Sequence, residues 1–424
     1  MKKNKVVLSI GLLLFFTIAT YADEEQVFSW QDCVRGAVSN NPRLVSAKEK
    51  VNQAEADSKI VQSTNMPQIT ADLAGDKSER AGSDEQTDSY SFGISGRQLL
   101  FDGSKTSKDV KEAEENIKAS VYSYTVVSSD VRLDLRTAFA ELMYTQELIL
   151  LTENIAMRRR QNLKLINLRY EAGREHKGSL LTAEADLARA EFEVAQARRA
   201  IPLKQRQLFK ELGIGKIRPL RVIGEFSIQG DYSAKPDIEY IADTTPFLNE
   251  LMAKKEAARY NLQSAKADFY PKVYLNGSIG TASSDFPPDQ KEWSAGVSLS
   301  LPIFEGGSRL AEVSGAESRL QQAEADEQSG KYSVLVTLET AWKDLKDAMT
   351  NVTVQKKFQD ATEERAKIAG VQYESGLISF NDWIIIENSL VISRKTHLRA
   401  RADMLLAEAN WIQAIGGTLS HEEE

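Results

Sequence analysis

SKTSKDVKEAEENIKASVYSYTVVSSDVRLDLRTAFAELMYTQELILLTENIAMRRRQNLKLINLRY, residues 104–170, is the stretch that decides the fold. It holds 67 residues without a proline, follows Phe101-Asp102-Gly103 and runs into Tyr170-Glu171-Ala172-Gly173. At 1.5 Å per residue it predicts a helix about 100 Å long, several times the ordinary length. A helix of that length needs other helices to pack against.

A second run repeats the first. Residues 307–373 are another 67 proline-free residues, between Phe304-Glu305-Gly306 and Tyr373-Glu374-Ser375-Gly376. Both runs carry an a/d heptad in one register. Its positions are Val334, Leu338, Ala341, Leu345, Ala348, Val352, Gln355, Gln359, Thr362, Ala366, Ala369 and Tyr373, and, 203 residues earlier, Val131, Leu135, Ala138, Leu142, Thr145, Ile149, Thr152, Ala156, Arg159, Leu163, Ile166 and Tyr170. The seam residues are apolar in the first half of each run and small or polar in the second half. This pattern favours a helix packed among several neighbours, and a plain structural coiled coil is the alternative.

The spacing of prolines indicates an internal repeat. Pro42 to Pro67 and Pro246 to Pro271 are both 25 residues, so two copies of one unit follow each other. The predicted order is signal peptide 1–22, first repeat 23–213, linker 214–243, second repeat 244–417 and a solvated tail 418–424. Each repeat holds a helix with an early break (Asn40-Asn41-Pro42 in the first), a β-hairpin (about 67–101 and 271–304), the long helix, a tip (171–179 and 374–381) and a return helix. Pro202 is expected to kink or split the first return helix.

The hairpins alternate apolar and polar residues. Ile69, Ala71 and Leu73 share one face, and Trp293, Ala295, Val297 and Leu299 do the same later. Each segment has the length of a tilted transmembrane strand, and residues 75–89 and 281–292 look like solvent loops. A small soluble sheet is the alternative. In a membrane, four strands cannot close a barrel and lipid tolerates no open edge, so several chains would pool their strands.

The first 22 residues read as a secretory signal peptide, with three lysines before an apolar run of about 14 residues. An uncleaved anchor is the alternative, but the run is short of the roughly 20 residues that a spanning helix needs. Cleavage changes the net charge from −8 to about −11, which disfavours nucleic acid as a partner. The single cysteine, Cys33, is expected to be a buried thiol on the first helix.

Residues for catalysis or cofactor binding do not stand out. The three histidines are far apart and, with one cysteine, offer no metal-ligand spacing. The glycines of Gly93-Ile94-Ser95-Gly96 lie in a predicted strand without a phosphate-loop lysine. We therefore expect no enzyme, no metal and no cofactor.

Taken in order, these motifs resemble the TolC-type outer-membrane channels of efflux pumps and type I secretion systems, also called outer membrane factors. The resemblance covers the whole mature chain. It rests on Trp30 to Val34 with Asn40-Asn41-Pro42, the Phe-Asp-Gly and Phe-Glu-Gly joints, the two tip motifs and Ile415-Gly416.

The resemblance implies a membrane α+β fold in a homotrimer. Four strands per chain would form a 12-stranded outer-membrane β-barrel in contact with lipid, and the long helices a coiled-coil barrel across the periplasm. The function implied is a passive exit duct for a tripartite efflux pump or type I secretion system, with a periplasmic adaptor and an inner-membrane transporter as partners.

The resemblance also implies site residues. It places Gly173-Arg174 and Gly376-Leu377 at the adaptor contact, although the two glycines also read as ordinary helix C-caps. Asp382 matches an aspartate ring that narrows the closed tunnel, but an N-cap is an equal alternative. Ile385 stands where the family's best-known member has a second aspartate, which suggests a partly hydrophobic constriction.

A periplasmic coiled-coil structural or adaptor protein with a small soluble sheet is the alternative function, and a duct without a pump is a minor one. The outward face of the four strands separates the first two. In a duct this face must be continuously apolar over about 25 Å, whereas in a soluble scaffold it does not have to be apolar.

Overall fold

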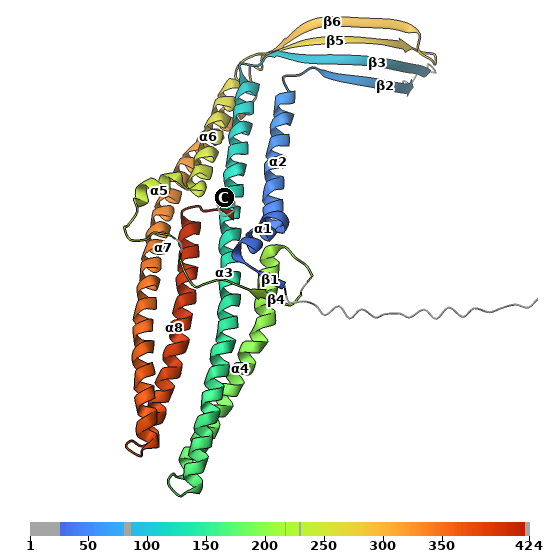
Figure 1. Ribbon diagram of the computed structural model, residues 1–424. Helices are drawn as coiled ribbons and strands as arrows, with labels where there is room; N and C mark the ends of the chain where they lie inside the picture. The colour runs from blue at the N-terminus through green and yellow to red at the C-terminus, as the bar shows by residue number, and fades with distance from the viewer. Residues whose placement is uncertain (1–25, 80–85, 217, 229, 420–424) are drawn as a thin grey trace, which may run out of the picture.

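Two helices of 67 residues dominate the molecule, and a four-stranded sheet lies across one end of them (Figure 1). The computed structural model describes residues 26–79, 86–216, 218–228 and 230–419, so the predicted signal peptide, 1–22, lies outside the described residues. The helices are α1 (Trp30–Asn40), α2 (Pro42–Ser63), α3 (Lys105–Glu171), α4 (Lys177–Leu212), α5 (Ile238–Thr244), α6 (Pro246–Ala267), α7 (Ser308–Glu374) and α8 (Phe380–Ala414). The strands are β1 (Gln26–Phe28), β2 (Gln68–Glu79), β3 (Gln86–Phe101), β4 (Leu220–Val222), β5 (Lys272–Ser283) and β6 (Gln290–Ser300).

The predicted heptad seam is confirmed in both long helices. Leu135 and Leu142 in α3 and Leu338 and Leu345 in α7 have no exposed surface. The other seam positions are buried or half-buried, except Tyr170, which is 38% exposed. Helix α3 packs against α2, α4, α6 and α8, as expected for a helix wedged among several neighbours.

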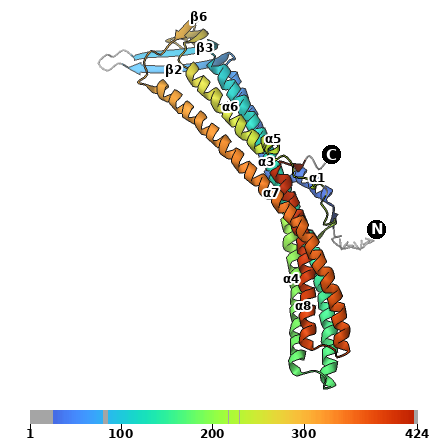
Figure 2. The ribbon, with the colours of Figure 1, turned by 90° about the vertical axis from the view of Figure 1, so that its left-hand side faces the viewer.

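The helices form two sets of neighbours along the rod. Toward the sheet, α3 lies between α2 and α6, and α6 packs on α7; toward the opposite end, the hairpins α3/α4 and α7/α8 pack through α3 and α8. Both hairpins turn at the end farthest from the sheet, and the sheet bends away to one side of the rod (Figures 1 and 2). Within the described part of the chain, no helix has the length and apolar character needed to cross a membrane.

The break at Asn40-Asn41-Pro42 is confirmed, and the end of a return helix packs against it. A Cβ on Gly213 would lie 2.1 Å from the carbonyl oxygen of Asn40. The same arrangement recurs later, where a Cβ on Gly416 would lie 2.4 Å from Pro246 Cδ. Gly213 has φ +71° and Gly416 has φ +83°, so each needs glycine both for conformation and for space.

Replacing Gly213 by Ala is expected to cost more stability than the same change at Gly173. The two glycines have nearly the same left-handed φ, +71° and +68°, worth about 1–2 kcal/mol of strain in each variant. No atom lies within 4 Å of a Cβ on Gly173, so only Gly213→Ala should lose a further 1–3 kcal/mol, roughly, from overpacking. Denaturant unfolding of both variants measures this, and equal losses would show that the contact with Asn40 is unimportant.

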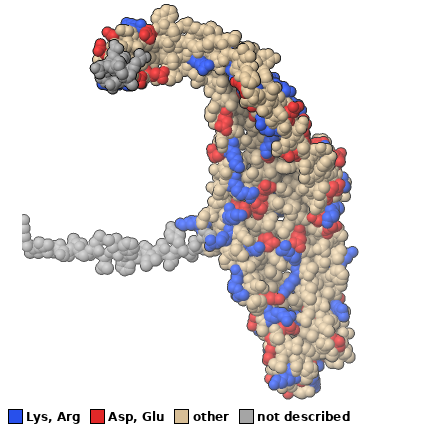
Figure 3. Space-filling view, turned by 180° about the vertical axis from the view of Figure 1, so that it is seen from behind, with Lys and Arg blue, Asp and Glu red and all other residues tan. Residues whose placement is uncertain are grey.

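The order of the main sheet is β2-β3-β5-β6, all antiparallel. Its register separates two faces. One row across the sheet is Ala71, Ile94, Ile279 and Trp293, and the adjacent row on the other face is Thr70, Ser95, Ser278 and Ser294. The apolar face is uncovered in this chain: Ile279 is 66% and Trp293 80% exposed. Figure 3 shows charged side chains of both signs scattered over the helices, whereas the visible surface of the sheet is mostly uncharged.

The strands run farther than predicted. Pairing of β2 with β3 continues from Gly75↔Tyr90 to Glu79↔Gln86, and β5 pairs with β6 out to Ala282↔Gln290. The expected loops 75–89 and 281–292 are therefore partly strand, and the prediction of long solvent loops is wrong. Polar residues hide these strand ends from an alternation test, because the backbone ladder does not require apolar side chains.

A belt of short elements lies beside the long helices, around the middle of the rod. Strand β1 pairs in parallel with β4, and the chain from β4 to α5 crosses the helices (Figure 1). We refer to β1, β4, α5 and the residues between β4 and α5 as the belt. Residues 214–243 were expected to be a linker or equatorial region, but β1, β4 and α5 were not predicted, because strands of three residues are too short to show a period.

Cys33 has no exposed surface, as predicted. Helix α4 runs through Pro202 as one helix, so the expected split is wrong; Ala197 and Leu208 are buried on either side and hold the flanking turns in place. The tail was expected to be solvated, but Leu419 is buried, which corrects that prediction for the described part of the tail.

Candidate gate and docking site at the helical tips

Both hairpins turn through a left-handed glycine. Gly173 has φ +68° and Gly376 has φ +76°. The amide of Arg174 donates to the carbonyl of Arg169 at 2.8 Å, and that of Leu377 to Gln372, also at 2.8 Å. These bonds span five residues and close each helix in a Schellman motif, which explains the glycines by backbone conformation alone.

The residues expected at an adaptor contact lie at the two turns. Leu377 is 73% exposed and Arg174 is also exposed. Gly173 and Gly376 have open space where a Cβ would be. Each turn therefore presents a small residue followed by one exposed side chain, basic at one turn and apolar at the other.

Asp382 lies in the first turn of α8, three residues after the N-cap. Ser379 is the N-cap, and its Oγ accepts from the Asp382 amide at 3.2 Å. The Ser379 hydroxyl also donates to the Asp382 carboxylate at 2.7 Å. The alternative that Asp382 is itself the N-cap is therefore wrong, although it stabilises the same helix start. Ile385, one turn farther along α8, is 54% exposed.

Sequence reasoning did not identify the cluster that joins the two hairpins at the tip. Tyr373 is 1% exposed and its hydroxyl donates to the Glu175 carboxylate at 2.7 Å. Arg169 donates to the Tyr373 carbonyl oxygen at 2.6 Å and lies over its ring, 4.4 Å from the centroid. Trp383 stacks on the other face at 4.5 Å. We call Arg169, Glu175, Tyr373 and Trp383 the tip latch.

The protonation states of Tyr373 and Glu175 keep the hydrogen bond between them intact at neutral pH. Burial raises the pKa of Tyr373 above its usual value, as does the hydrogen bond to Glu175. Burial also acts to raise the pKa of Glu175, but hydrogen bonds from Tyr373, Ser179 and the His176 amide outweigh it and lower that pKa. The phenol therefore stays a donor and the carboxylate an acceptor.

The tip latch is expected to weaken in acid. Because the pKa of Glu175 is lowered from 4.5, its stabilising effect is complete above that pH and is lost as the pH falls through the lowered pKa. Hydrogen exchange of the amides at 373–379 should therefore accelerate below about pH 4.5, beyond the intrinsic pH dependence. Tyr373→Phe, which lacks the hydroxyl, should exchange faster at pH 7 and gain little more in acid; an unchanged pH 7 rate in Tyr373→Phe would contradict the assignment.

A second link joins α3 to α8 above the tip. Arg158 makes two hydrogen bonds to the Glu387 carboxylate, at 2.7 and 2.6 Å. The Glu387 side chain is 1% exposed. Arg159 donates to Asn388 beside it and lies 4.0 Å from Asp186 of α4. The two hairpins are thus joined here by charged groups as well as by Val391 of α8, which packs against Ile155 and Ala156 of α3.

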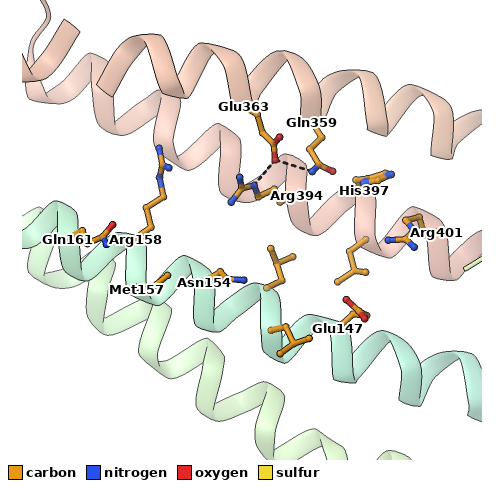
Figure 4. A pocket seen from close by; sticks show the side chains of 13 residues that line it. Glu147, Asn154, Met157, Arg158, Gln161, Gln359, Glu363, Arg394, His397 and Arg401 are labelled. Atoms are coloured by element: carbon orange, nitrogen blue, oxygen red, sulfur yellow. Dashed lines mark hydrogen bonds and ion pairs between the residues drawn. The ribbon is translucent and has the colours of Figure 1, made fainter. Parts of the chain in front are cut away.

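A polar groove of about 660 Å³ separates α3 from α7 and α8 beside this link (Figure 4). Its α8 side carries Arg394, His397 and Arg401, and Glu363 of α7 bonds to both Arg394 and Gln359. Arg401 lies 4.8 Å from the ring of Phe226 in the belt, which places the groove on the belt side of the helices. The bond between Arg394 and Glu363 joins α8 to α7 within one hairpin, and the groove lies between that hairpin and α3.

Among the described residues, no group of three His, Cys, Asp or Glu side chains is placed to hold a metal ion. The arrangement is mechanical: two helical hairpins, latched at the tip and again above it, with a polar groove between them.

Comparison with known proteins now defines the class. Residues 34–214 and 241–417 match the family described as outer membrane efflux protein, so the chain belongs to that family. It is an outer-membrane protein, the outer-membrane component of an efflux pump, and its family is one of channels rather than enzymes. The predicted TolC-type resemblance is confirmed.

Individual relatives are distant but cover nearly the whole chain. The chain is 24% identical over 403 residues to the cation efflux system protein CusC of Escherichia coli O157:H7, covering 90% of this chain and 84% of CusC. It is 24% identical over 421 residues to the outer membrane protein OprJ of Pseudomonas aeruginosa, covering 90% and 82%. The open-state structure of the Neisseria gonorrhoeae MtrE outer membrane channel superposes with a TM-score of 0.82 at 20% identity, covering 92% of this chain and 89% of that one. The fold is therefore that of outer-membrane channels, with the helices extending into the periplasm.

Proposed function

We propose that three copies of the chain form a passive exit duct that carries substrates from an inner-membrane transporter, through a periplasmic adaptor, across the outer membrane. The observation that carries this proposal is the sheet. One face carries apolar side chains on all four strands and is uncovered, and the edge strands β2 and β6 have no neighbour on their outer sides among the described residues. Lipid would cover the apolar face, and further copies would pair the edges.

Three copies of this four-stranded sheet would supply twelve strands. The helices also offer surfaces for a neighbour. Leu310 at the start of α7 is 70% exposed, and Ile60 near the end of α2 is 67% exposed. Helices α7 and α2 are the outer members of the set near the sheet, so α7 of one copy would pack on α2 of the next and close a ring.

The two units that supply this ring are proposed to be structural repeats. Their long helices α3 and α7 are each 67 residues, and each return helix ends against the start of its own unit. We keep the limits 23–213 and 244–417, with 214–243 between them and 418–424 at the end.

The tips are the proposed adaptor site. Arg174 and Leu377 are exposed beside the two turns, at the end of the rod farthest from the sheet. We also keep the proposal that the duct works with a type I secretion system. The relatives include a cation efflux protein, CusC, but the identity of 24% carries no substrate over to this chain.

Asp382 and Ile385 are the proposed constriction. Both lie near the start of α8, where three copies would bring their side chains together around the axis. Asp382→Ala is expected to leave assembly intact and to raise the leak conductance in planar bilayers, because the carboxylates that narrow the passage, and the cations they bind there, would be lost. Unchanged conductance would remove Asp382 from the gate, and Asp382→Asn tests whether its charge matters.

Site-specific photocrosslinking in cells tests the proposed function. A photoreactive residue at Leu377 should capture the adaptor, whereas the same residue at Tyr240 in α5, which is 70% exposed, should not. Capture at neither position, with the protein present in the outer membrane, would count against the adaptor contact. The periplasmic scaffold is disfavoured by the family match and by the uncovered apolar sheet.

A further inference from the structure

The polar face of the sheet carries one arginine near the ends of the helices. Arg97 in β3 lies in a row with Gln68, Asn276 and Gly296. Gln68 is the first residue of β2, five residues after the end of α2. In the proposed duct, this row forms the inner wall of the barrel where it meets the helical tunnel.

The guanidinium of Arg97 is held in place without a carboxylate. It stacks on Tyr274 of β5, 3.7 Å from the ring centroid. No ion pair of Arg97 is found among the residues that the structure describes. Because stacking uses the flat face of the group, the N–H donors at its edge stay free to bind an anionic oxygen.

The other charged residues on the polar face of the sheet do not neutralise Arg97. Lys272 pairs with Asp268 at 2.9 Å. Asp72 lies in one row with Gly93, Gly280 and Glu292, four residues along β2 from the Arg97 row. At about 3.4 Å per residue, that acidic row is about 14 Å nearer the loops. The row at the base of the barrel is thus basic, and the acidic row is separated from it by the uncharged row of Thr70, Ser95, Ser278 and Ser294.

We propose that Arg97, positioned by Tyr274, is a binding element for anionic groups such as phosphate or carboxylate at the base of the barrel. This inference rests on the proposed duct. Three copies would set three guanidinium groups around one lumen, where their fields add and anions collect. Arg97 would retain anionic solutes at this level of the lumen.

Block of single channels by sodium tripolyphosphate tests the inference. The protein is inserted into a planar bilayer from one side, so the helices stay on that side and the sheet opens to the other. Tripolyphosphate in the chamber facing the sheet should reduce the current. Arg97→Gln removes all three guanidinium groups and should need at least about tenfold more tripolyphosphate for the same block, the factor expected when even one charged hydrogen bond is lost.

Matched variants separate charge from packing. Tyr274→Phe keeps the ring and should leave the block unchanged, whereas Tyr274→Ala frees the guanidinium and should weaken it. Asp72→Asn removes a negative charge on the same face and should strengthen the block. Equal block of the unaltered chain and Arg97→Gln, or conductance insensitive to tripolyphosphate, would overturn the inference. Absence of any conductance would instead overturn the proposed duct, and the inference with it.

Discussion

Ile279→Arg is expected to prevent stable assembly in the outer membrane. Ile279 lies midway along β5 on the apolar face and is 66% exposed in the single chain. An arginine facing lipid near the bilayer midplane costs about 2–4 kcal/mol in a barrel. Because each of the three chains would contribute one such arginine, the total cost would reach roughly 6–12 kcal/mol. This is comparable to the free energy of unfolding of an ordinary domain.

Ser278→Arg is the matched control for that change. Ser278 is the preceding residue on the same strand, but it faces the hydroxyl row on the opposite side of the sheet. The arginine would there meet water in the lumen, so the variant should reach the outer membrane at nearly normal levels. Fractionation and semi-denaturing gels measure both, and equal tolerance of the two arginines would mean that Ile279 does not face lipid.

Arg158→Ala is expected to loosen α8 from α3. It would leave the Glu387 carboxylate, 1% exposed, without its two strongest hydrogen bonds. Removing one partner of a buried pair costs about 3–5 kcal/mol, and the lower end applies because Arg158 is 39% exposed. Hydrogen exchange of the α8 amides around Glu387 measures the lost protection directly.

Arg160→Ala is the control, two residues along the same helix. Its pair with Glu191 is exposed, at 66% and 50% for the two side chains, and should contribute only about 0–1 kcal/mol. Joint replacement of Arg158 by Met and Glu387 by Leu should restore much of the protection, because an apolar pair needs no partner for a buried charge. Similar effects of Arg158→Ala and Arg160→Ala would show that the Glu387 link does not hold the hairpins together.

The long helices and the sheet could be predicted because their patterns are local and long. A seam repeated over 67 residues predicts a helix, and α3 and α7 each begin and end within one residue of the predicted limits. The alternation of Ile69, Ala71 and Leu73 likewise assigned β2 to a two-faced strand. The turn glycines followed from backbone conformation, since both are left-handed.

The tip latch and the belt could not be predicted in this way. Tyr373 meets Glu175 and Arg169 across 198 and 204 residues of sequence, and no periodicity connects positions so far apart. Even so, the charges of Arg169 and Glu175 beside a helical turn, and Tyr373 at the last seam position, were signals that together could have indicated a contact. The role proposed for Arg97 could not be predicted from the sequence either, because it depends on the strand register that places Arg97 on the polar face beside Tyr274.

The number of chains in the complex extracted from the outer membrane tests the central claim most directly. Native mass spectrometry of the detergent-extracted protein is expected to give the mass of three chains, because a single four-stranded sheet leaves two edges and an apolar face uncovered. A single chain, released in the periplasmic extract without detergent, would contradict the account.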